Sequence, residues 1–192
     1  MVGKNPVVGL LALQGAFGQH KNILEYLGCK VVLVKNHEQL GEIEGLVIPG
    51  GESGAMLRML RVDGFLEKLQ VSTLPVFGTC AGAILLAKTV KNPSQESFGK
   101  IPMTITRNGY GRQTDSFDDV LTMADKDGRK ISARFIRAPI ISKIFDNVEV
   151  LAYYKQQPVA VRYKKYIATT FHPELTGETY FHEKFLETVQ SS

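Results

Sequence analysis

The first half of this sequence alternates short apolar runs with helix-forming segments, and that alternation limits the folds open to it. Near-continuous apolar runs, such as residues 7–13 and 31–34, have the composition of strands that are covered on both faces. A helical pattern at 17–27 ends at Gly28, and further helical patterns occur near Met56 and after Cys80. Strands that alternate with helices predict a parallel sheet with helices on both of its faces.

The second half has a different pattern, in which short apolar runs are separated by turn-forming groups such as 125–128 and 163–165. This is typical of antiparallel hairpins, and a last helix is expected at about 178–189. The strand-like runs are 101–105, 120–123, 131–136, 148–153, 159–162 and 166–171. We therefore predict an α/β fold of three layers, α/β/α, with a mostly parallel central sheet, helices on both faces and antiparallel strands in the second half.

Composition favours a single domain over residues 1–192, because a chain of this length with 44% hydrophobic residues can bury one core and little more. The net charge of +4 is dispersed apart from one basic group at 162–165, so no nucleic-acid partner is expected. There is no signal-peptide pattern, and no run approaches the roughly 18 apolar residues of a membrane span. The two cysteines give no disulfide framework, and we expect a cytoplasmic protein without membrane attachment.

The run Gly78-Thr79-Cys80-Ala81-Gly82 has the pattern of a turn that presents a nucleophile. It lies between an apolar strand and an apolar helix, as in the Gly-x-Ser-x-Gly elbow, where glycines allow a tight turn. The amide N–H groups and the dipole at a helix N-terminus favour a thiolate there. The alternative is that Cys80 is a small buried hydrophobic residue, which is the role we expect for Cys29.

A cysteine nucleophile needs a base, and the chain has four histidines. His37 lies in a polar segment and His182 in an amphipathic helix, so both are expected on the surface. His172 instead ends an apolar strand, where side chains of an open α/β sheet face the ligand crevice. Pro173 favours an extended conformation at His172, so that Glu174 can reach the ring and fix its tautomer. The alternative is an ordinary loop after a strand.

A third motif, Gly50-Gly51-Glu52-Ser53, follows a buried strand and precedes a helix. Its glycine amides are expected in the same crevice, where they can stabilise the negative oxygen of a tetrahedral intermediate. An ordinary strand-to-helix turn with Ser53 as the helix N-cap is the simpler interpretation, and the two are compatible.

Together these motifs resemble the class I, triad-type glutamine amidotransferases, in which a Cys-His-Glu triad hydrolyses the side-chain amide of glutamine. The order of the residues fits, because the acid follows the histidine here, whereas it precedes the histidine in α/β-hydrolases. Further segments are similar to the PdxT family, the glutaminase subunits of pyridoxal 5′-phosphate synthase. These segments are Leu13-Gln14-Gly15-Ala16 with His20, 49–53, 107–108, 110–113, 115–117, 135–139 and 172–176.

The resemblance implies a role for each matching residue. Cys80 is expected to be the nucleophile, His172 the base and Glu174 its orienting acid. The family's glutamine-binding positions correspond to Gly51, Glu52, Ser53, Arg107, Ile136 and Arg137. Backbone N–H groups of Gly51 and Ala81 are expected to hold the oxyanion. One departure is Gly54-Ala55, where relatives commonly have threonines, which puts a hydroxyl contact there in doubt.

The resemblance also implies a partner, a (β/α)8-barrel synthase subunit that builds pyridoxal 5′-phosphate from ribose 5-phosphate, glyceraldehyde 3-phosphate and the released ammonia. Gln14 and His20 are expected to serve the contact with that subunit, or alternatively to be helix-entry residues. No metal and no organic cofactor is expected.

Three other functions stay open on the sequence. Another glutaminase, such as the subunit used in imidazole-glycerol-phosphate synthesis, would share the elbow and the triad. A non-catalytic regulatory module would keep only the fold, and a stand-alone cysteine hydrolase would act without a partner. Hydrolysis of glutamine with and without each synthase subunit separates these possibilities.

Overall fold

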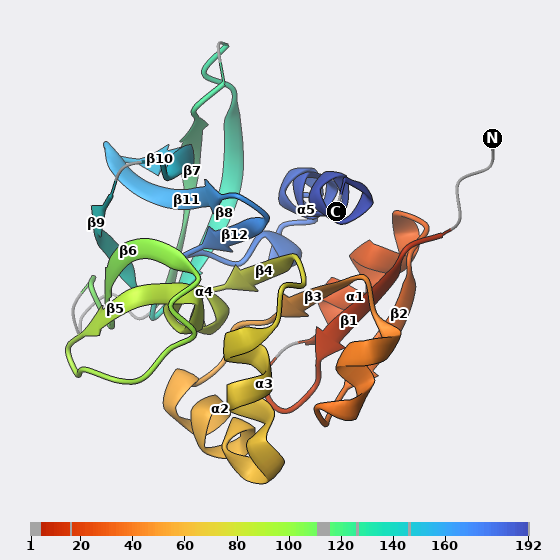
Figure 1. The fold of residues 1–192 in the computed structure, drawn as a ribbon. Helices are drawn as coiled ribbons and strands as arrows, with labels where there is room; N and C mark the ends of the chain where they lie inside the picture. The colour runs from red at the N-terminus through yellow and green to blue at the C-terminus, as the bar shows by residue number, and fades with distance from the viewer. Residues whose placement is uncertain (1–4, 16, 111–115, 126, 146, 192) are drawn as a thin grey trace.

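The computed structural model describes residues 5–15, 17–110, 116–125, 127–145 and 147–191 (Figure 1). Ala16 and the family-like segment at 111–115 lie outside the described residues. The helices are α1 Phe17–Tyr26, α2 Ser53–Leu60, α3 Phe65–Val71, α4 Ala81–Leu86 and α5 Tyr180–Gln190, with 3₁₀ turns η1 Glu38–Glu42, η2 Val62–Gly64 and η3 Pro173–Leu175. The strands are β1 Val7–Leu11, β2 Lys30–Val34, β3 Gly45–Ile48, β4 Val76–Thr79, β5 Ala87–Lys91, β6 Ile101–Thr106, β7 Ser116–Met123, β8 Lys130–Ile136, β9 Ile140–Ile144, β10 Glu149–Tyr154, β11 Gln157–Tyr163 and β12 Tyr166–Thr169.

The main sheet has nine strands in the order β2-β1-β3-β4-β12-β11-β10-β7-β8. Its first five strands are parallel, as the continuous apolar runs of the first half predict. From β12 onward each strand is antiparallel to its neighbour. β12 therefore joins the two halves, since it pairs in parallel with β4 and antiparallel with β11.

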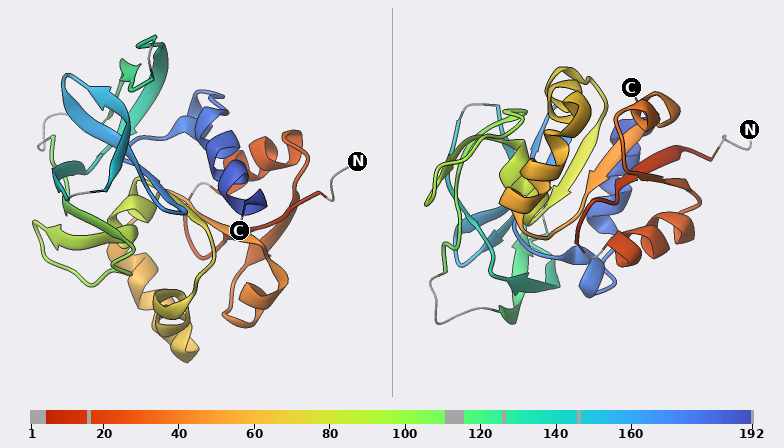
Figure 2. Two further views of the ribbon diagram at one scale, coloured as in Figure 1. Left: turned by 45° about the horizontal axis from the view of Figure 1, so that its top comes forward. Right: turned by 90° about the horizontal axis from the view of Figure 1, so that it is seen from below.

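Helices cover both faces of the parallel part, which confirms the predicted three layers (Figure 2). On one face α1 and α5 pack through residues such as Leu24, Phe181 and Phe185. On the other face α2, α3 and α4 pack through residues such as Met56 and Leu85. The apolar faces of these helices are thus buried against the strands that lead into the site.

The structure differs from the sequence prediction beside α4, where β5, β6 and β9 form a separate three-stranded sheet. We predicted β6 as part of the hairpins on the main sheet, and we predicted neither β5 nor β9 as a strand. Exposed polar residues interrupt both missed strands, Lys88 and Thr89 in β5 and Ser142 and Lys143 in β9, so neither has a continuous apolar run. The small sheet positions Arg107, which directly follows β6.

Candidate active site

Two neighbouring parallel strands deliver the candidate catalytic residues to the same edge of the sheet. Thr79 of β4 is in register with Thr169 of β12, Cys80 follows Thr79, and His172 lies three residues beyond Thr169. The backbone N–H of Cys80 donates to the Thr169 carbonyl at 2.8 Å, and that of His172 donates to the Arg134 carbonyl at 2.9 Å. Both segments are thereby fixed to the sheet at its carboxyl edge, where ligands bind in open α/β folds.

The predicted elbow is present, and its geometry requires the two glycines. Cys80 has φ 48° and ψ −98°, a conformation that residues with a side chain rarely adopt. A Cβ added at Gly78 would lie 2.5 Å from the backbone of Gly82, and one at Gly82 would lie 2.3 Å from the Ile48 carbonyl oxygen. The helix can therefore approach the strands closely enough to hold Cys80 in its strained turn.

His172 and Glu174 form a buried pair, with Nδ1 of His172 2.7 Å from Oε1 of Glu174. Burial lowers the pKa of His172, but hydrogen bonding and charge from Cys80 and Glu174 outweigh it and raise this pKa to about 10. Burial opposes ionisation of Glu174 as well, but the His172 hydrogen bond and nearby positive charge hold its pKa below the ordinary value. His172 is thus kept as a cation and Glu174 as an anion at neutral pH.

The way in which Glu174 reaches the ring differs from the prediction. His172 itself has φ −109° and ψ 84°, but Pro173 begins the 3₁₀ turn η3, and Glu174 lies within that turn. The carboxylate therefore approaches the ring from a helical turn and not from an extended segment. A proline at the first position of a helical turn is favourable because its missing N–H would have no partner there.

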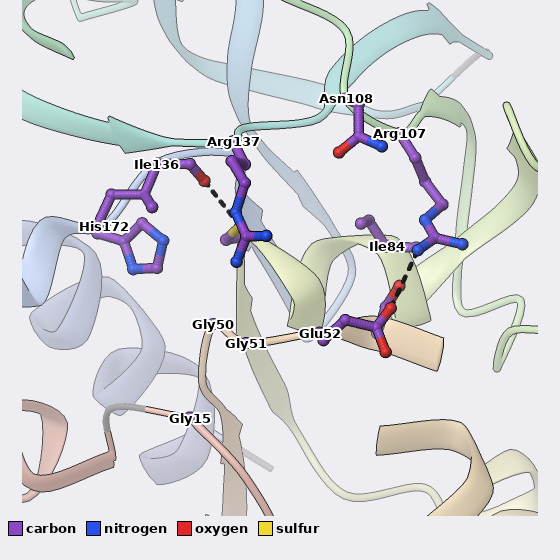
Figure 3. Close-up of a pocket in the computed structure, with 12 residues that line it drawn as sticks. Gly15, Gly50, Gly51, Glu52, Ile84, Arg107, Asn108, Ile136, Arg137 and His172 are labelled. Atoms are coloured by element: carbon purple, nitrogen blue, oxygen red, sulfur yellow. Dashed lines mark hydrogen bonds and ion pairs between the residues drawn. The ribbon is translucent and has the colours of Figure 1, made fainter. Parts of the chain in front are cut away.

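Cys80 lines a pocket of about 310 Å³, and Figure 3 shows how the labelled residues of this pocket lie around it. Its thiol is 3.8 Å from the carbonyl oxygen of Ile136, which is oriented toward the sulfur, and its exposed fraction is 6%. The lining residues are Gly15, Gly50, Gly51, Glu52, Ser53, Cys80, Ile84, Arg107, Asn108, Ile136, Arg137 and His172. The structure thus brings the six expected glutamine-binding positions around one pocket with Cys80 and His172.

Glu52 and Arg107 form a charged pair on the wall opposite His172, with the guanidinium 3.1 Å from the carboxylate (Figure 3). The Glu52 side chain also caps α2, because it accepts from the N–H groups of Gly54 and Ala55 at 3.0 and 2.5 Å. Burial opposes its ionisation, but these N–H groups and Arg107 keep the pKa of Glu52 below its ordinary value.

Ser53 is consequently not the helix N-cap that the simpler interpretation of this motif predicted. It is the first residue of α2, with Glu52 as the cap, and its hydroxyl donates to Oε1 of Gln95 at 3.0 Å. The carboxylate offers a separate oxygen to each of the two amide N–H groups, Oε1 to Gly54 and Oε2 to Ala55.

Close backbone contacts join the Gly50 segment to both sides of the pocket. A Cβ at Gly50 would lie 2.2 Å from Cε1 of His172, so only glycine allows the imidazole this close. Gly15 has φ +95°, and a Cβ there would lie 1.8 Å from the Gly50 carbonyl oxygen. Gln14 precedes this contact and is half-buried, and its Oε1 has no hydrogen-bond partner in the described part of the chain.

Four expected positions do not line the pocket: Gln14, Ala81, Glu174 and His20. Ala81 begins α4 directly after Cys80, and Glu174 lies behind His172, away from the opening. His20 was expected at the contact with a partner, but it is fully buried against Glu174 and presents no surface to a partner. The prediction that His182 is exposed is also wrong, because its exposed fraction is 0%.

Three lining residues were given no place in the predicted site, namely Gly15, Ile84 and Asn108, and Gly50 was expected there only as part of its glycine motif. Gly15, Gly50 and Asn108 lie within the motifs that carry the resemblance, so the motifs contained the signal. Ile84 is four residues after Cys80, one helical turn along α4, and the elbow pattern alone places such a residue on the same side of the helix.

Among the described residues, no group of three or more histidines, cysteines or acidic residues is arranged to hold a metal ion. No helix in the same part of the chain is long and apolar enough to cross a membrane.

Comparison with known proteins now decides the family. A model of the SNO glutamine amidotransferase family matches residues 10–191. The chain belongs to this family. Two relatives, both named pyridoxal 5′-phosphate synthase subunit PdxT, are similar over nearly their whole length. The Koribacter versatilis protein is 50% identical, with 96% of each chain covered, and the Thermosipho africanus protein is 45% identical, with 95% of this chain and 98% of the relative covered.

Solved structures agree with the fold that this family implies. A crystal structure of a glutamine amidotransferase is 39% identical, covers 95% of this chain and 98% of its own, and has a TM-score of 0.87. A glutamine amidotransferase from Thermotoga maritima has a TM-score of 0.62 at 12% identity, with 97% of this chain and 85% of its own covered, which shows a shared fold alone. The resemblance drawn from the sequence motifs is confirmed, as is the predicted fold class.

Proposed function

We propose that this amidotransferase-family chain is a glutaminase subunit, which hydrolyses L-glutamine to L-glutamate and ammonia for a separate subunit of pyridoxal 5′-phosphate synthase. The observation that carries the proposal is that Cys80 lines the same pocket as His172, which forms a buried ion pair with Glu174. The names of the relatives supply the synthase, since those proteins are subunits of it.

The proposed first step uses the proton that His172 holds. The Cys80 thiolate attacks the carbonyl carbon of the glutamine side-chain amide, and the negative oxygen is held by backbone N–H groups of Gly51 and Ala81. The His172 imidazolium then donates its proton to the departing nitrogen, the C–N bond breaks, and ammonia leaves a thioester on Cys80. The raised pKa of His172, about 10, supports its role as the proton donor at neutral pH.

The second step restores the starting state. Neutral His172 takes a proton from water, the resulting hydroxide attacks the thioester carbonyl, and the C–S bond breaks to release glutamate and the thiolate. Glu174 keeps Nδ1 of His172 protonated throughout, so that Nε2 is the nitrogen that exchanges protons. Neither step needs a metal ion or an organic cofactor.

The charged groups around the pocket suit a zwitterionic amino acid. The guanidinium groups of Arg107 and Arg137 are donors for its α-carboxylate, and Glu52 and the Ile136 carbonyl are acceptors for its ammonium group. The Glu52 carboxylate keeps capacity for a ligand, because its side chain is 43% exposed despite its bond to Arg107.

A docked acceptor subunit is the second part of the proposal. Ammonia becomes protonated in water and loses its nucleophilicity, so direct transfer to a (β/α)8-barrel synthase subunit preserves it. Gln14 is the residue we propose near the subunit contact, because its loop packs on Gly50 through Gly15. We further propose one domain for residues 1–192, since one sheet runs through both halves, and a cytoplasmic location, which two unpaired cysteines support.

The decisive experiment measures glutamine hydrolysis by the wild type and by Cys80→Ala, each with and without the synthase subunit. We expect activity that depends on the synthase subunit, and a loss of at least about 10³-fold in Cys80→Ala. Cys29→Ala is the matched control, because it removes the other thiol, which is buried in the core away from the pocket, and should keep its activity.

The other outcomes identify the alternatives. Full activity of Cys80→Ala in the presence of its partner contradicts the assignment of the nucleophile. Stimulation by the cyclase subunit of imidazole-glycerol-phosphate synthase instead would indicate a different amidotransferase. Activity that needs no partner indicates a stand-alone hydrolase, and a wild type that neither hydrolyses glutamine nor reacts at Cys80 with a glutamine-like electrophile indicates a regulatory module.

A further inference from the structure

His20 and His182 form a buried pair that the proposed mechanism does not use. Both side chains have an exposed fraction of 0%, although the residues are 162 positions apart in the sequence. His20 lies on α1 and His182 on α5, and the ring of Phe77 in β4 lies edge-on to both. Burial of an imidazole is unfavourable unless its nitrogens find hydrogen-bond partners, so the pair requires an explanation.

The pair contacts the candidate triad at Glu174. Oε1 of Glu174 is bound by His172, whereas Oε2 is buried and has no hydrogen-bond partner within the described part of the chain. Nε2 of His20 lies 3.4 Å from this second oxygen and 3.2 Å from the hydroxyl of Thr79, the residue before Cys80. A distance of 3.4 Å is longer than an ordinary hydrogen bond, and a small movement of either side chain would complete one.

The charge on Glu174 determines where the protons of the pair lie. A proton on Nε2 of His20 is attracted to the carboxylate, whereas a lone pair there would be repelled by it. Nδ1 of His20 is then an acceptor, and it lies 2.9 Å from Nε2 of His182, which must carry the proton between them. This assignment leaves Nδ1 of His182 without a proton. The Glu178 backbone, which raises the pKa of His182, is the acceptor that the opposite tautomer would use.

Both members of the pair act as neutral dipoles. Burial lowers the pKa of His20, with a further lowering by His172 and an opposing effect of Glu174. Burial also lowers the pKa of His182, and His20 adds to this, against a smaller opposing effect of the Glu178 backbone. The pair therefore offers the carboxylate an N–H group without adding a second positive charge beside His172.

We propose that His20 is a positioning residue for the triad, because its Nε2–H holds the outer oxygen of Glu174 while His182 fixes the tautomer that makes this possible. Glu174 is then held on both sides, and its inner oxygen keeps a constant direction toward His172. The inference rests on the proposed function, since the orientation of Glu174 matters only if His172 transfers protons. It gives His20 a place inside the catalytic subunit instead of at the partner contact.

The test compares His20→Phe, which keeps a ring without nitrogens, with His20→Gln, whose amide N–H can reach the place of Nε2. With saturating synthase subunit, we expect His20→Phe to lower kcat for glutamine hydrolysis about 10- to 100-fold, while KM stays within about twofold. The alkaline limb of its pH profile should move to lower pH, because a less firmly held Glu174 raises the pKa of His172 less. His20→Gln should regain a substantial part of kcat. His37→Phe is the matched control, since His37 lies before η1 and outside the pocket, and should be unchanged.

Two results would overturn the proposal. One is an unchanged kcat and pH profile in folded His20→Phe. The other is an equal loss of kcat in both His20 variants at equal thermal stability, which indicates a purely structural role.

Nitrogen-15 NMR of the wild-type protein locates the ring protons directly and does not depend on activity. We expect the ring proton of His20 on Nε2. A ring proton of His20 on Nδ1, together with donation from His182 toward Glu178, would contradict the proposal. A wild type that hydrolyses no glutamine refutes the proposed function instead, and the NMR result then still decides the tautomer.

Discussion

The two walls of the pocket are built by opposite physical means. The wall that carries the proposed catalytic residues, called the catalytic wall below, consists of Cys80 and His172, and Glu174 supports it from behind His172. These residues are 6%, 7% and 5% exposed and are fixed by a strained turn, close glycine contacts and a buried ion pair. The binding wall consists of Glu52 and Arg107, whose side chains are 43% and 18% exposed and are held by their mutual charge. The difference fits the proposed roles, because proton transfer needs fixed geometry, whereas ligand exchange needs charges that water can reach.

The largest effect is expected on the catalytic wall, from Glu174→Gln. The amide keeps the shape but removes the charge that orients His172, so we expect kcat to fall by about 10³- to 10⁴-fold with little change in KM. Because Glu174 raises the pKa of His172, the alkaline limb of any residual activity should move to lower pH. A wild-type rate in Glu174→Gln would show that the carboxylate has no part in orienting the base.

The same pair gives a stability test. The folded pKa of His172 is about 10 against an ordinary 6.5, and that of Glu174 lies below its ordinary 4.5. The stabilisation from His172 is complete below about pH 6.5 and is lost as the pH rises through 10, while that from Glu174 is complete above about pH 4.5. Thermal unfolding of wild type and Glu174→Gln should therefore differ most between about pH 4.5 and 6.5.

Gly50→Ala tests how tightly the catalytic wall is fitted. The new methyl group would lie 2.2 Å from Cε1 of His172, so the ring must move, and a displacement of about 1 Å can reduce the rate about 10²-fold. Gly41→Ala is the control, since a Cβ at Gly41 has no atom within 4 Å, and its kcat should be unchanged. Equal kcat in the two variants would mean that the fit against His172 is unimportant.

The smallest effect is expected on the binding wall, from Arg107→Gln. Loss of one partly solvated charge should raise KM for glutamine about tenfold and leave kcat within about twofold of the wild-type value. Because salt screens exposed charges, added salt should reduce the difference in KM between the variant and the wild type. Arg61→Gln removes a similar ion pair with Glu96, at 3.0 Å but outside the pocket, and should change neither constant. A fall in kcat alone would place Arg107 with the catalytic wall.

The parallel half of the fold could be predicted because its strands are buried on both faces and their sequences are continuous apolar runs. β5 and β9 could not be predicted, because each has adjacent exposed polar residues and few buried ones, and only pairing with neighbouring strands makes them strands. The predicted end of the last strand was also displaced. The predicted run 166–171 extends past Thr169, where β12 ends, into the buried segment that leads to His172. The apolar character of this segment therefore reflects burial of its side chains, and it does not show where the strand's hydrogen bonds end.

For the site, the motifs identified the pocket residues but not the burial of the other histidines. His182 follows Phe181 and precedes Leu186 by four positions, so it lies on the same buried stripe of α5 as both. His20 likewise precedes the buried Leu24 by four positions on α1. The helical periodicity therefore indicated that both histidines are buried. Our prediction for His182 instead followed the general rule that histidines are rarely buried. The tertiary contact with Glu174, which compensates the burial, is not visible in the sequence.

The position of β12 beside β4 has a consequence for the order in which this chain acquires reactivity. The ribosome makes the elbow and its thiol well before it makes Phe171 and His172. The base reaches Cys80 only when β12, the last of the described strands, has been synthesised and has inserted between β4 and β11. A nascent or truncated chain that lacks β12 therefore carries Cys80 without the proposed base, so on the proposed mechanism the thiol becomes competent only once β12 has joined the sheet.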